Sequence, residues 1–150
     1  MLAEVLLRGM EKIKAVKMKM TQIWKDDIIV PVSPLRFIDG SQLDLFKEGD
    51  LVKVIGITKG KGFEGVVKRH GFHGGPKTHG QKNRLRAPGS IGSTAPQRVL
   101  PGRKMAGRMG GNRQSVFRLE VANINKEGGI LMVKGSVPGN IGNKLEIVKI

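Results

Sequence analysis

The side chains best suited to acid–base or metal chemistry are three histidines, His70, His73 and His79, which lie within the run HGFHGGPKTH. Histidine binds transition metals and serves as a general base, but a catalytic base also needs an acid to orient it. The chain has no cysteine, and the only carboxylate near the histidines is Glu64, among many Lys and Arg side chains. These surroundings disfavour a metal ion and a histidine nuclease, so we predict no catalytic residue and no metal site. Hydrogen bonding to nucleic acid or stacking on its bases is the favoured use of the three rings.

A glycine-rich stretch resembles two nucleotide-binding motifs without satisfying either. Residues Gly60–Gly65 fit the pattern G-x-G-x-x-G after an apolar strand. A dinucleotide site would also need a long helix and an acidic residue about 20 positions later. Val66–His70 is too short for that helix, and residues 83–86 read Asn-Arg-Leu-Arg. Gly56–Lys61 is one residue too short for a P-loop, and Gly62 replaces its Ser or Thr. We therefore expect no cofactor and no small-molecule substrate.

The charge of the chain is concentrated in one segment. The 150 residues include 27 Lys and Arg against 12 Asp and Glu, a net charge of +15. Residues 59–113, the basic segment, hold 13 of the basic residues and one acid, Glu64, for a net charge of +12. The same segment contains 13 of the 22 glycines and four of the seven prolines. This charge favours a polyanionic partner, because the cations repel one another until something neutralises them.

Composition also limits the compartment and the chemistry. Without cysteine the chain builds no disulfide scaffold, zinc ribbon or thiol active site. No apolar run reaches the roughly 18 residues that a membrane-spanning helix needs. The start, MLAEVLLRG, has neither the basic region nor the apolar length of a signal peptide. We therefore expect a cytoplasmic protein with no membrane partner.

Outside the basic segment, short patterned runs predict strands. Two of them, residues 16–20 and 117–121, alternate apolar and charged side chains, and the others are the apolar runs 28–32, 51–57, 130–133 and 145–150. Gly, Asp, Asn or Pro separates them, and Asp26–Asp27 is interpreted as a turn rather than a catalytic pair. Trp24 and the methionines at strand spacing are predicted to lie in the core. A helix over residues 2–13 has weak support, because Gly9 interrupts it.

This pattern predicts an all-β barrel or sandwich that carries one long excursion. The body would comprise residues 1–58 and 114–150 as one discontinuous domain, with the basic segment between them. A loop of this length without structure of its own is improbable in a self-contained domain and normally indicates function or disorder. Glycines let the backbone approach phosphates, and Lys and Arg displace counterions. We expect an arm that RNA or DNA orders, and the alternative is a solvated, disordered loop.

Several motifs along the chain form a joint pattern. The run GKGFEGVVKRHGF at 60–72 continues as GGPKTHG, and RAPGSIG at 86–92 and GRKMAGRMGG at 102–111 follow. MTQIW at 20–24 and LMVKGSVPG at 131–139 belong to the same pattern. Each motif alone is weak, but in this order they closely resemble the ribosomal protein L-three family of the large subunit, bacterial type. Within that resemblance, MTQIW is similar to the N-terminal strand of the family and LMVKGSVPG to its C-terminal strand.

The resemblance implies both a fold and a role. The fold would be mainly β, a small translation-protein-like β-barrel with a long, basic, Gly-rich extended loop. That loop would thread through large-subunit rRNA toward the peptidyl-transferase region, and the chain would contact neighbouring large-subunit ribosomal proteins. The chain would be a structural constituent of the large subunit in the cytoplasm, with a role in subunit assembly and translation. It would not be an enzyme, since peptide-bond chemistry is left to RNA.

Carried over by position, the resemblance also assigns a set of RNA-binding residues. Their work would be contact with phosphates and 2′-hydroxyls. The set comprises Lys59, Lys61, Lys68, Arg69, His70, His73, Lys77, His79, Lys82, Arg84, Arg86, Ser90, Gln97, Arg98, Arg103, Lys104, Arg108 and Arg113.

The chain departs from the family pattern in several places. Residues 32–38 pass almost directly to the strand before GKG, where the family has several tens of residues, so the barrel would lack a subdomain or some strands. Ala15 and Lys19 replace glycines that usually precede the Met-Thr pair. Residues 1–9 precede the usual start, which makes Met10 a candidate initiator. The loop tip is slightly short, so no modified glutamine is assigned to Gln97.

Two other functions remain as alternatives. A free-standing RNA chaperone on the same body would act on many RNAs with little preference, whereas a ribosomal protein would stay on one rRNA site. A nucleic-acid enzyme would lose its activity when His70, His73 or His79 is changed singly. A binding protein would instead show graded effects from such changes.

Overall fold

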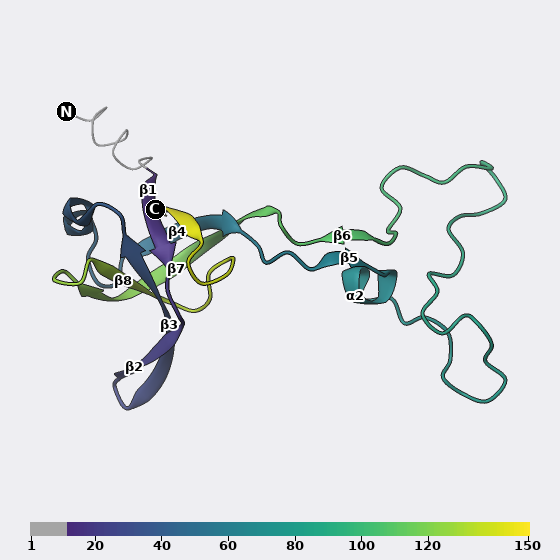
Figure 1. The fold of residues 1–150 in the computed structure, drawn as a ribbon, viewed down its shortest axis with the longest axis horizontal. Coiled ribbons are helices and arrows are strands. Elements are labelled where there is room, and N and C mark those ends of the chain that lie inside the picture. Colours follow the sequence, from purple (N-terminus) through teal and green to yellow (C-terminus); the bar gives the residue numbers. More distant parts are fainter. Residues whose placement is uncertain (1–11) are drawn as a thin grey trace. The chain divides into compact units, whose positions relative to one another are not determined.

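The computed structural model describes residues 12–150, which fall into two units. The barrel unit comprises the described residues up to Lys59 together with Gly111–Ile150, and the arm unit comprises Gly60–Gly110. Strands predominate, and the described chain has only two short helical pieces (Figure 1). No helix in residues 12–150 has the length and apolar character to cross a membrane.

Six antiparallel strands form a closed barrel. Around the ring they are β1 (Ile13–Lys17), β9 (Lys144–Lys149), β4 (Leu51–Ile57), β7 (Arg113–Asn125), β8 (Ile130–Lys134) and β3 (Ile28–Phe37). The ring is complete because β3 returns to β1, with Ala15 opposite Phe37 and Lys17 opposite Leu35. The prediction of a small, mainly β barrel is confirmed, and the barrel closes despite the short connection after β3.

β2 (Thr21–Lys25) lies outside this ring and forms a hairpin with the first half of β3 (Figure 1). Asp26 and Asp27 connect the two strands at φ 49° and 61°. Positive φ at both central residues is the conformation of a type I′ turn, whose twist matches that of a hairpin. The interpretation of Asp26–Asp27 as a turn is therefore confirmed.

Aliphatic side chains at alternate strand positions fill the barrel. The strand residues of this core are Ile13, Ala15, Leu35, Phe37, Val52, Val54, Val121, Leu131, Val133, Leu145 and Ile147. The 3-10 helix η1 (Gly40–Leu45) adds Leu43, and Phe46 follows directly after it. The ring of Phe46 meets that of Phe37 edge-on, with centroids 5.7 Å apart. The short connection between β3 and β4 therefore contributes core side chains of its own.

The predictions for the first hairpin are partly wrong. Residues 16–20 are not one strand, because β1 ends at Lys17 and β2 begins at Thr21. The fully buried positions of β1 are Ile13 and Ala15, so the predicted alternation was out of phase by one residue. Trp24 is 71% exposed rather than buried in the core, because β2 lies outside the ring. Met20, in the connection between β1 and β2, is 44% exposed.

Residues 117–121 form a strand as predicted, within β7, but a bulge turns Phe117 away from the face that the alternation indicated. The pairing of β7 with β4 shifts between Val52 and Val54, and Arg118 on β7 has φ 55°. An extra residue in one strand changes which face the preceding side chains occupy. Phe117 is consequently 59% exposed, and its ring faces Lys53 Nζ at 4.6 Å.

The remaining strand predictions are confirmed, with shifts at their ends. The run 51–57 is β4 itself, 130–133 becomes β8 with one more residue, and 145–150 is shifted by one residue in β9. The run 28–32 continues to Phe37, so β3 is about twice as long as predicted. The weak helix over residues 2–13 lies outside the described residues, apart from its last two positions, and Met10 lies outside them as well.

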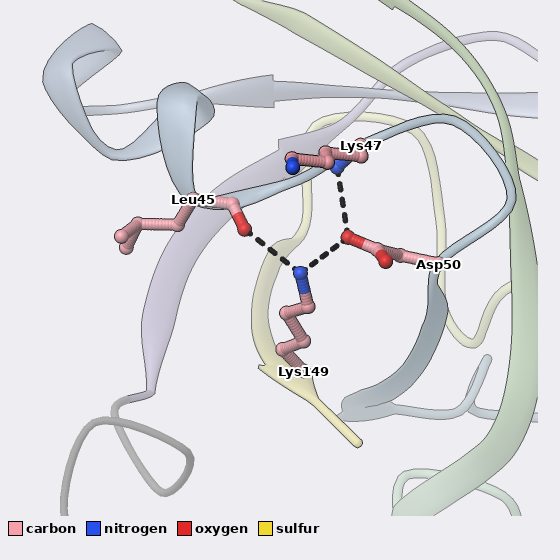
Figure 2. A network of polar contacts seen from close by, with 4 residues as sticks. All are labelled: Leu45, Lys47, Asp50 and Lys149. Atoms are coloured by element: carbon pink, nitrogen blue, oxygen red, sulfur yellow. Dashed lines mark hydrogen bonds and ion pairs between the residues drawn. The ribbon is translucent and has the colours of Figure 1, made fainter. Parts of the chain in front are cut away.

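A small polar network joins the turn before β4 to the end of β9 (Figure 2). Lys149 Nζ donates to the carboxylate of Asp50 and to the carbonyl oxygen of Leu45, the latter at 3.1 Å. The backbone N–H of Lys47 donates to the same Asp50 oxygen at 2.8 Å. The hydrogen bond from Lys149, helped by the one from Lys47, holds the pKa of Asp50 below its ordinary value.

Asp50→Asn is expected to lower the free energy of unfolding at pH 7 by about 1 kcal/mol, the usual net value of a partly exposed charged hydrogen bond. Because folding lowers the pKa of Asp50, its ionised form stabilises the fold at pH values above 3.8, the ordinary pKa of the group. That contribution is lost as the pH falls through the folded pKa. Urea midpoints at pH 7 and pH 2.5 should therefore show the wild type and the variant converging at acid pH. An equal difference at both pH values would contradict this role.

Candidate nucleic-acid interface

The arm unit begins as a short two-stranded ribbon. β5 (Gly62–Glu64) pairs antiparallel with β6 (Gly107–Met109), and the N–H of Lys61 donates to the carbonyl of Met109 at 2.9 Å. One helical piece, α2 (Val66–His70), follows, with Val66 buried. Gly71 ends it at φ 73°, and its N–H donates to the carbonyls of Val66 and Val67. Part of the basic segment is thus regular structure, which the sequence analysis did not predict.

α2 also holds the returning chain of the arm. Arg69 Nη1 donates to the carbonyl oxygen of Met105 at 2.7 Å, and His70 Nε2 lies 3.0 Å from the same oxygen. The guanidinium of Arg69 lies directly over Gly107, where a Cβ would come within 2.5 Å of Nη1. Arg69 and His70, both predicted to contact RNA, are half-buried and help to hold the arm in shape.

Gly107→Ala is expected to displace the guanidinium of Arg69 and to break its bond to Met105. Loss of about 1.4 kcal/mol of local stability would speed amide exchange at Lys61 and at the α2 amides about tenfold, leaving the barrel amides unchanged. Hydrogen exchange followed by NMR measures this. Gly60→Ala is the matched control, because a Cβ there meets nothing within 4 Å. Similar exchange rates in the two variants would contradict the proposal that the Arg69–Met105 hydrogen bond, which we call the clamp, holds the arm.

Farther along, the arm folds back on itself at two glycines. The N–H of Gly75 donates to the carbonyls of Arg84 and Leu85, both at 3.0 Å. A Cβ on Gly75 would lie 2.6 Å from the Arg84 oxygen, and one on Gly74 would overlap the Leu85 carbonyl. The two backbones touch only because neither glycine has a side chain. This crossing closes residues 75–84 into a small loop that carries several of the predicted residues.

The structure exposes most of the predicted residues. Lys59 and Arg113 belong to the barrel unit and the others to the arm unit. Apart from Arg69 and His70, every residue of the set is exposed, including the histidines His73 and His79. Ser90 Oγ is occupied in a local turn, donating to the carbonyl of Gly92 at 2.8 Å.

The predicted cations differ in whether they already have a partner. Lys68 pairs with Glu64 at 2.6 Å, and Arg113 pairs with Glu146 at 2.9 Å. Arg103 donates to the carbonyl of Ser90. The remaining ones make no ion pair or side-chain hydrogen bond within residues 12–150: Lys59, Lys61, Lys77, Lys82, Arg84, Arg86, Arg98, Lys104 and Arg108. We call these the free cations. Because they are exposed and pair with no carboxylate within residues 12–150, they are available to an external anion.

Sequence reasoning missed the exposed apolar side chains of the arm. Phe63, on β5 opposite Arg108, is 79% exposed, and Leu100 is 58% exposed. An aromatic ring beside cations can stack on unpaired bases. The available signal was a single aromatic residue in the strand-like run GKGFEG, between Gly62 and Glu64.

The arm unit also contains a hollow of about 630 Å³, lined by Gly71–Gly75, Arg84 and Ala87–Gly89. His73 contributes to its wall, and the ring of Phe72 lies 6.0 Å from that of His70. In the described part of the chain, no three His, Asp or Glu side chains gather as a metal site. The groups brought together on the arm are donors, cations and apolar surfaces, which suit binding.

Comparison with known proteins shows which family the chain resembles. The family model described as Ribosomal protein L3 matches residues 36–129. The Large ribosomal subunit protein uL3 of Chlorobaculum parvum is 53% identical over 107 residues, which are 71% of this chain and 51% of the relative. The protein of the same name from Chlorobium phaeobacteroides is 45% identical over 131 residues, 87% of this chain and 61% of the relative. That from Gloeothece citriformis is 52% identical over 110 residues, 73% and 51% of the two chains.

Two facts follow from these matches. The chain spans about half the length of most of the curated relatives named here. The family match covers more than half of the chain and includes η1, β4, the whole arm unit and β7. The resemblance read from the motifs is confirmed: this chain belongs to the ribosomal protein L3 family.

Proposed function

We propose that the chain is a structural protein of the large ribosomal subunit and that its arm unit binds large-subunit rRNA. The observation that carries the proposal is the set of free cations, eight of the nine on the glycine-rich arm unit, in a chain of this family. The arm unit has one acid, Glu64, and Lys68 already neutralises it. An external polyanion is the partner that would relieve the repulsion among the others.

The two units would divide the work. The barrel unit folds around its own aliphatic core, whereas the arm unit has few buried side chains and would gain most of its order from RNA. The ribbon and the clamp of Arg69 on Met105 would keep the two limbs of the arm together, so that exposed cations on both limbs meet phosphates.

In the assembled subunit, the arm would extend through rRNA toward the peptidyl-transferase region. The barrel unit would contact neighbouring ribosomal proteins, and the chain would contribute to subunit assembly and translation in the cytoplasm. The protein would act by binding and positioning RNA, with no catalytic step of its own.

The salt dependence of RNA binding tests the proposal. We would measure binding of the full chain to protein-free large-subunit rRNA between 0.1 and 0.6 M KCl. Each neutralised phosphate contributes about −0.9 to the slope of log K against log salt in duplexes and about −0.7 in single strands. With the free cations engaged, we expect a slope of about −5 or steeper. A slope near zero would contradict an arm that binds through phosphates.

A competition experiment tests whether the site is specific. Excess bulk tRNA should displace little of the chain from large-subunit rRNA, because a structural protein recognises one folded site. If tRNA competes as well as the rRNA itself, the chain is instead an RNA chaperone of low selectivity.

A further inference from the structure

The barrel unit has a hollow of its own, of about 650 Å³. Three lysines line it, Lys17, Lys19 and Lys59, of which only Lys59 belongs to the predicted RNA-binding set. No carboxylate is among the lining residues. A concave, carboxylate-free surface with three lysines is built to attract an anion.

Lys17 is fixed in this hollow by the backbone. Its Nζ donates to the carbonyls of Val137 and Gly139, both at 2.7 Å. An ammonium group has three donors, so one remains for a further acceptor. The long side chain is therefore held in place before any ligand arrives, which reduces the entropy lost on binding.

Lys17 and Lys59 also repel each other. Burial lowers the pKa of Lys17, and the positive charge of Lys59 lowers it further. Two like charges held together without an acid between them are unfavourable by themselves, and a bound anion would remove that cost. Two ammonium groups placed in this way suit a phosphate group.

The rest of the wall is apolar. Met20 and Ile141 line the hollow and are 44% and 66% exposed, respectively. Methionine adapts its shape to flat or irregular partners. A nucleotide has an anionic group that matches the lysines and a flat part that matches the apolar wall. The volume of the hollow lies in the usual range of roughly 300–1,000 Å³ for small-molecule sites.

We propose that this hollow binds one nucleotide of an RNA strand, with its phosphate between Lys17 and Lys59 and its base or sugar against Met20 and Ile141. The inference rests on the proposed function, because it takes RNA as the partner. It adds a contact made by the barrel unit to those proposed for the arm unit. It also explains why Met20, on a strand-like pattern, is not buried in the core.

Lysine footprinting on the unmodified full chain tests this inference. The chain would be acetylated with and without large-subunit rRNA, and each lysine would be quantified by mass spectrometry. We expect rRNA to protect Lys17, Lys19 and Lys59 at least threefold, leaving Lys47 unchanged as an exposed barrel lysine outside the hollow. If Lys77 and Lys82 of the arm are protected but Lys17 and Lys19 are not, this site is wrong and the proposed function stands. If no lysine is protected, both fail.

A second measurement identifies the source of the phosphate. Uridine 5′-monophosphate alone, at the same nucleotide concentration, should give no protection, because a single nucleotide lacks the neighbouring contacts of a strand. Equal protection by the mononucleotide would make the hollow a site for free nucleotides and would overturn the proposal of an RNA strand.

A matched pair of variants tests the apolar wall. Ile141→Glu places a negative charge in the hollow, and Ile28→Glu places one on the hairpin at a residue with the same 66% exposure. Both should fold, since neither side chain is buried. We expect Ile141→Glu to weaken rRNA binding about tenfold and to remove the protection of Lys59, while Ile28→Glu changes binding less than twofold. Equal effects of the two variants would contradict the site.

Discussion

A variant in which Lys82, Arg84, Arg86, Arg98 and Lys104 are all replaced by Met is expected to lose about a thousandfold or more of its affinity for large-subunit rRNA at 0.15 M salt. All five are exposed arm side chains without an internal partner. Each lost phosphate contact should also flatten the salt slope by about 0.7–0.9, so the five together would remove roughly 4 from it. Filter binding or fluorescence anisotropy across a salt series measures both quantities.

The control for this variant removes the same charge from the barrel unit. It replaces Lys47, Lys53, Lys126, Lys134 and Lys144, none of which lines the proposed hollow. We expect it to keep most of the affinity, because its cations are not part of the arm. If the control loses as much affinity as the arm variant, total charge rather than the arm governs binding, and the proposed role of the arm is wrong. Equal melting temperatures of the barrel unit in the arm variant and the wild type would show that folding is not the cause.

Gly56→Ala is expected to destabilise the barrel by about 2–3 kcal/mol, although it adds only a methyl group. Gly56 is a buried residue of β4, and a Cβ there would overlap Cδ2 of Leu145 and lie 3.3 Å from Cβ of Pro138. Leu145 is 1% exposed on the neighbouring strand β9, so its side chain would have to shift within the packed barrel. Urea unfolding followed by circular dichroism measures the loss.

A double-mutant cycle shows whether that contact is the cause. Leu145→Ala alone should cost about 2–5 kcal/mol by leaving a cavity. In the double variant the new methyl of residue 56 occupies part of this cavity. The loss of stability in the double variant should therefore be smaller than the sum of the two single losses by about 1 kcal/mol or more. Gly60→Ala serves as the control glycine, since its Cβ meets nothing within 4 Å. Strict additivity would contradict the account of packing at Gly56.

The barrel was predictable where a strand has one buried face and clear ends. β4 runs from Leu51 to Ile57 as the apolar run indicated, between a Gly-Asp turn and the basic segment. The turn at Asp26–Asp27 was also recognisable, because Asp tolerates positive φ and two acids rarely sit inside a strand.

Other features depended on tertiary structure that local pattern does not encode. The local sequence predicts that Trp24, a large apolar residue in a strand, is buried. It is exposed because β2 lies outside the closed ring. In the sequence, Phe117 continues the alternation of apolar and charged residues. The bulge at Arg118 nevertheless turns its side chain to the exposed face of the strand. Closure of the barrel rests on β1 pairing with both β3 and β9, strands far apart in the sequence.

The position of the candidate interface in the sequence was predictable, but the roles of its individual residues were not. Charge and glycine content marked the arm, and the motifs marked the family. Burial then separated Arg69 and His70, which hold Met105, from free cations such as Lys82. The hollow around Lys17 could not be found from the sequence, because β1, the end of β4 and the loop at residues 136–141 meet only in the folded barrel.

The most direct test of the central claim is the retention of the chain on large subunits. In the organism that encodes it, large subunits would be purified, washed at high salt and analysed by quantitative mass spectrometry. The proposed function predicts one copy of the chain per subunit after the wash, because an arm enclosed by rRNA is released only when the RNA opens. Loss of the chain into the free fraction would contradict a structural role in the subunit.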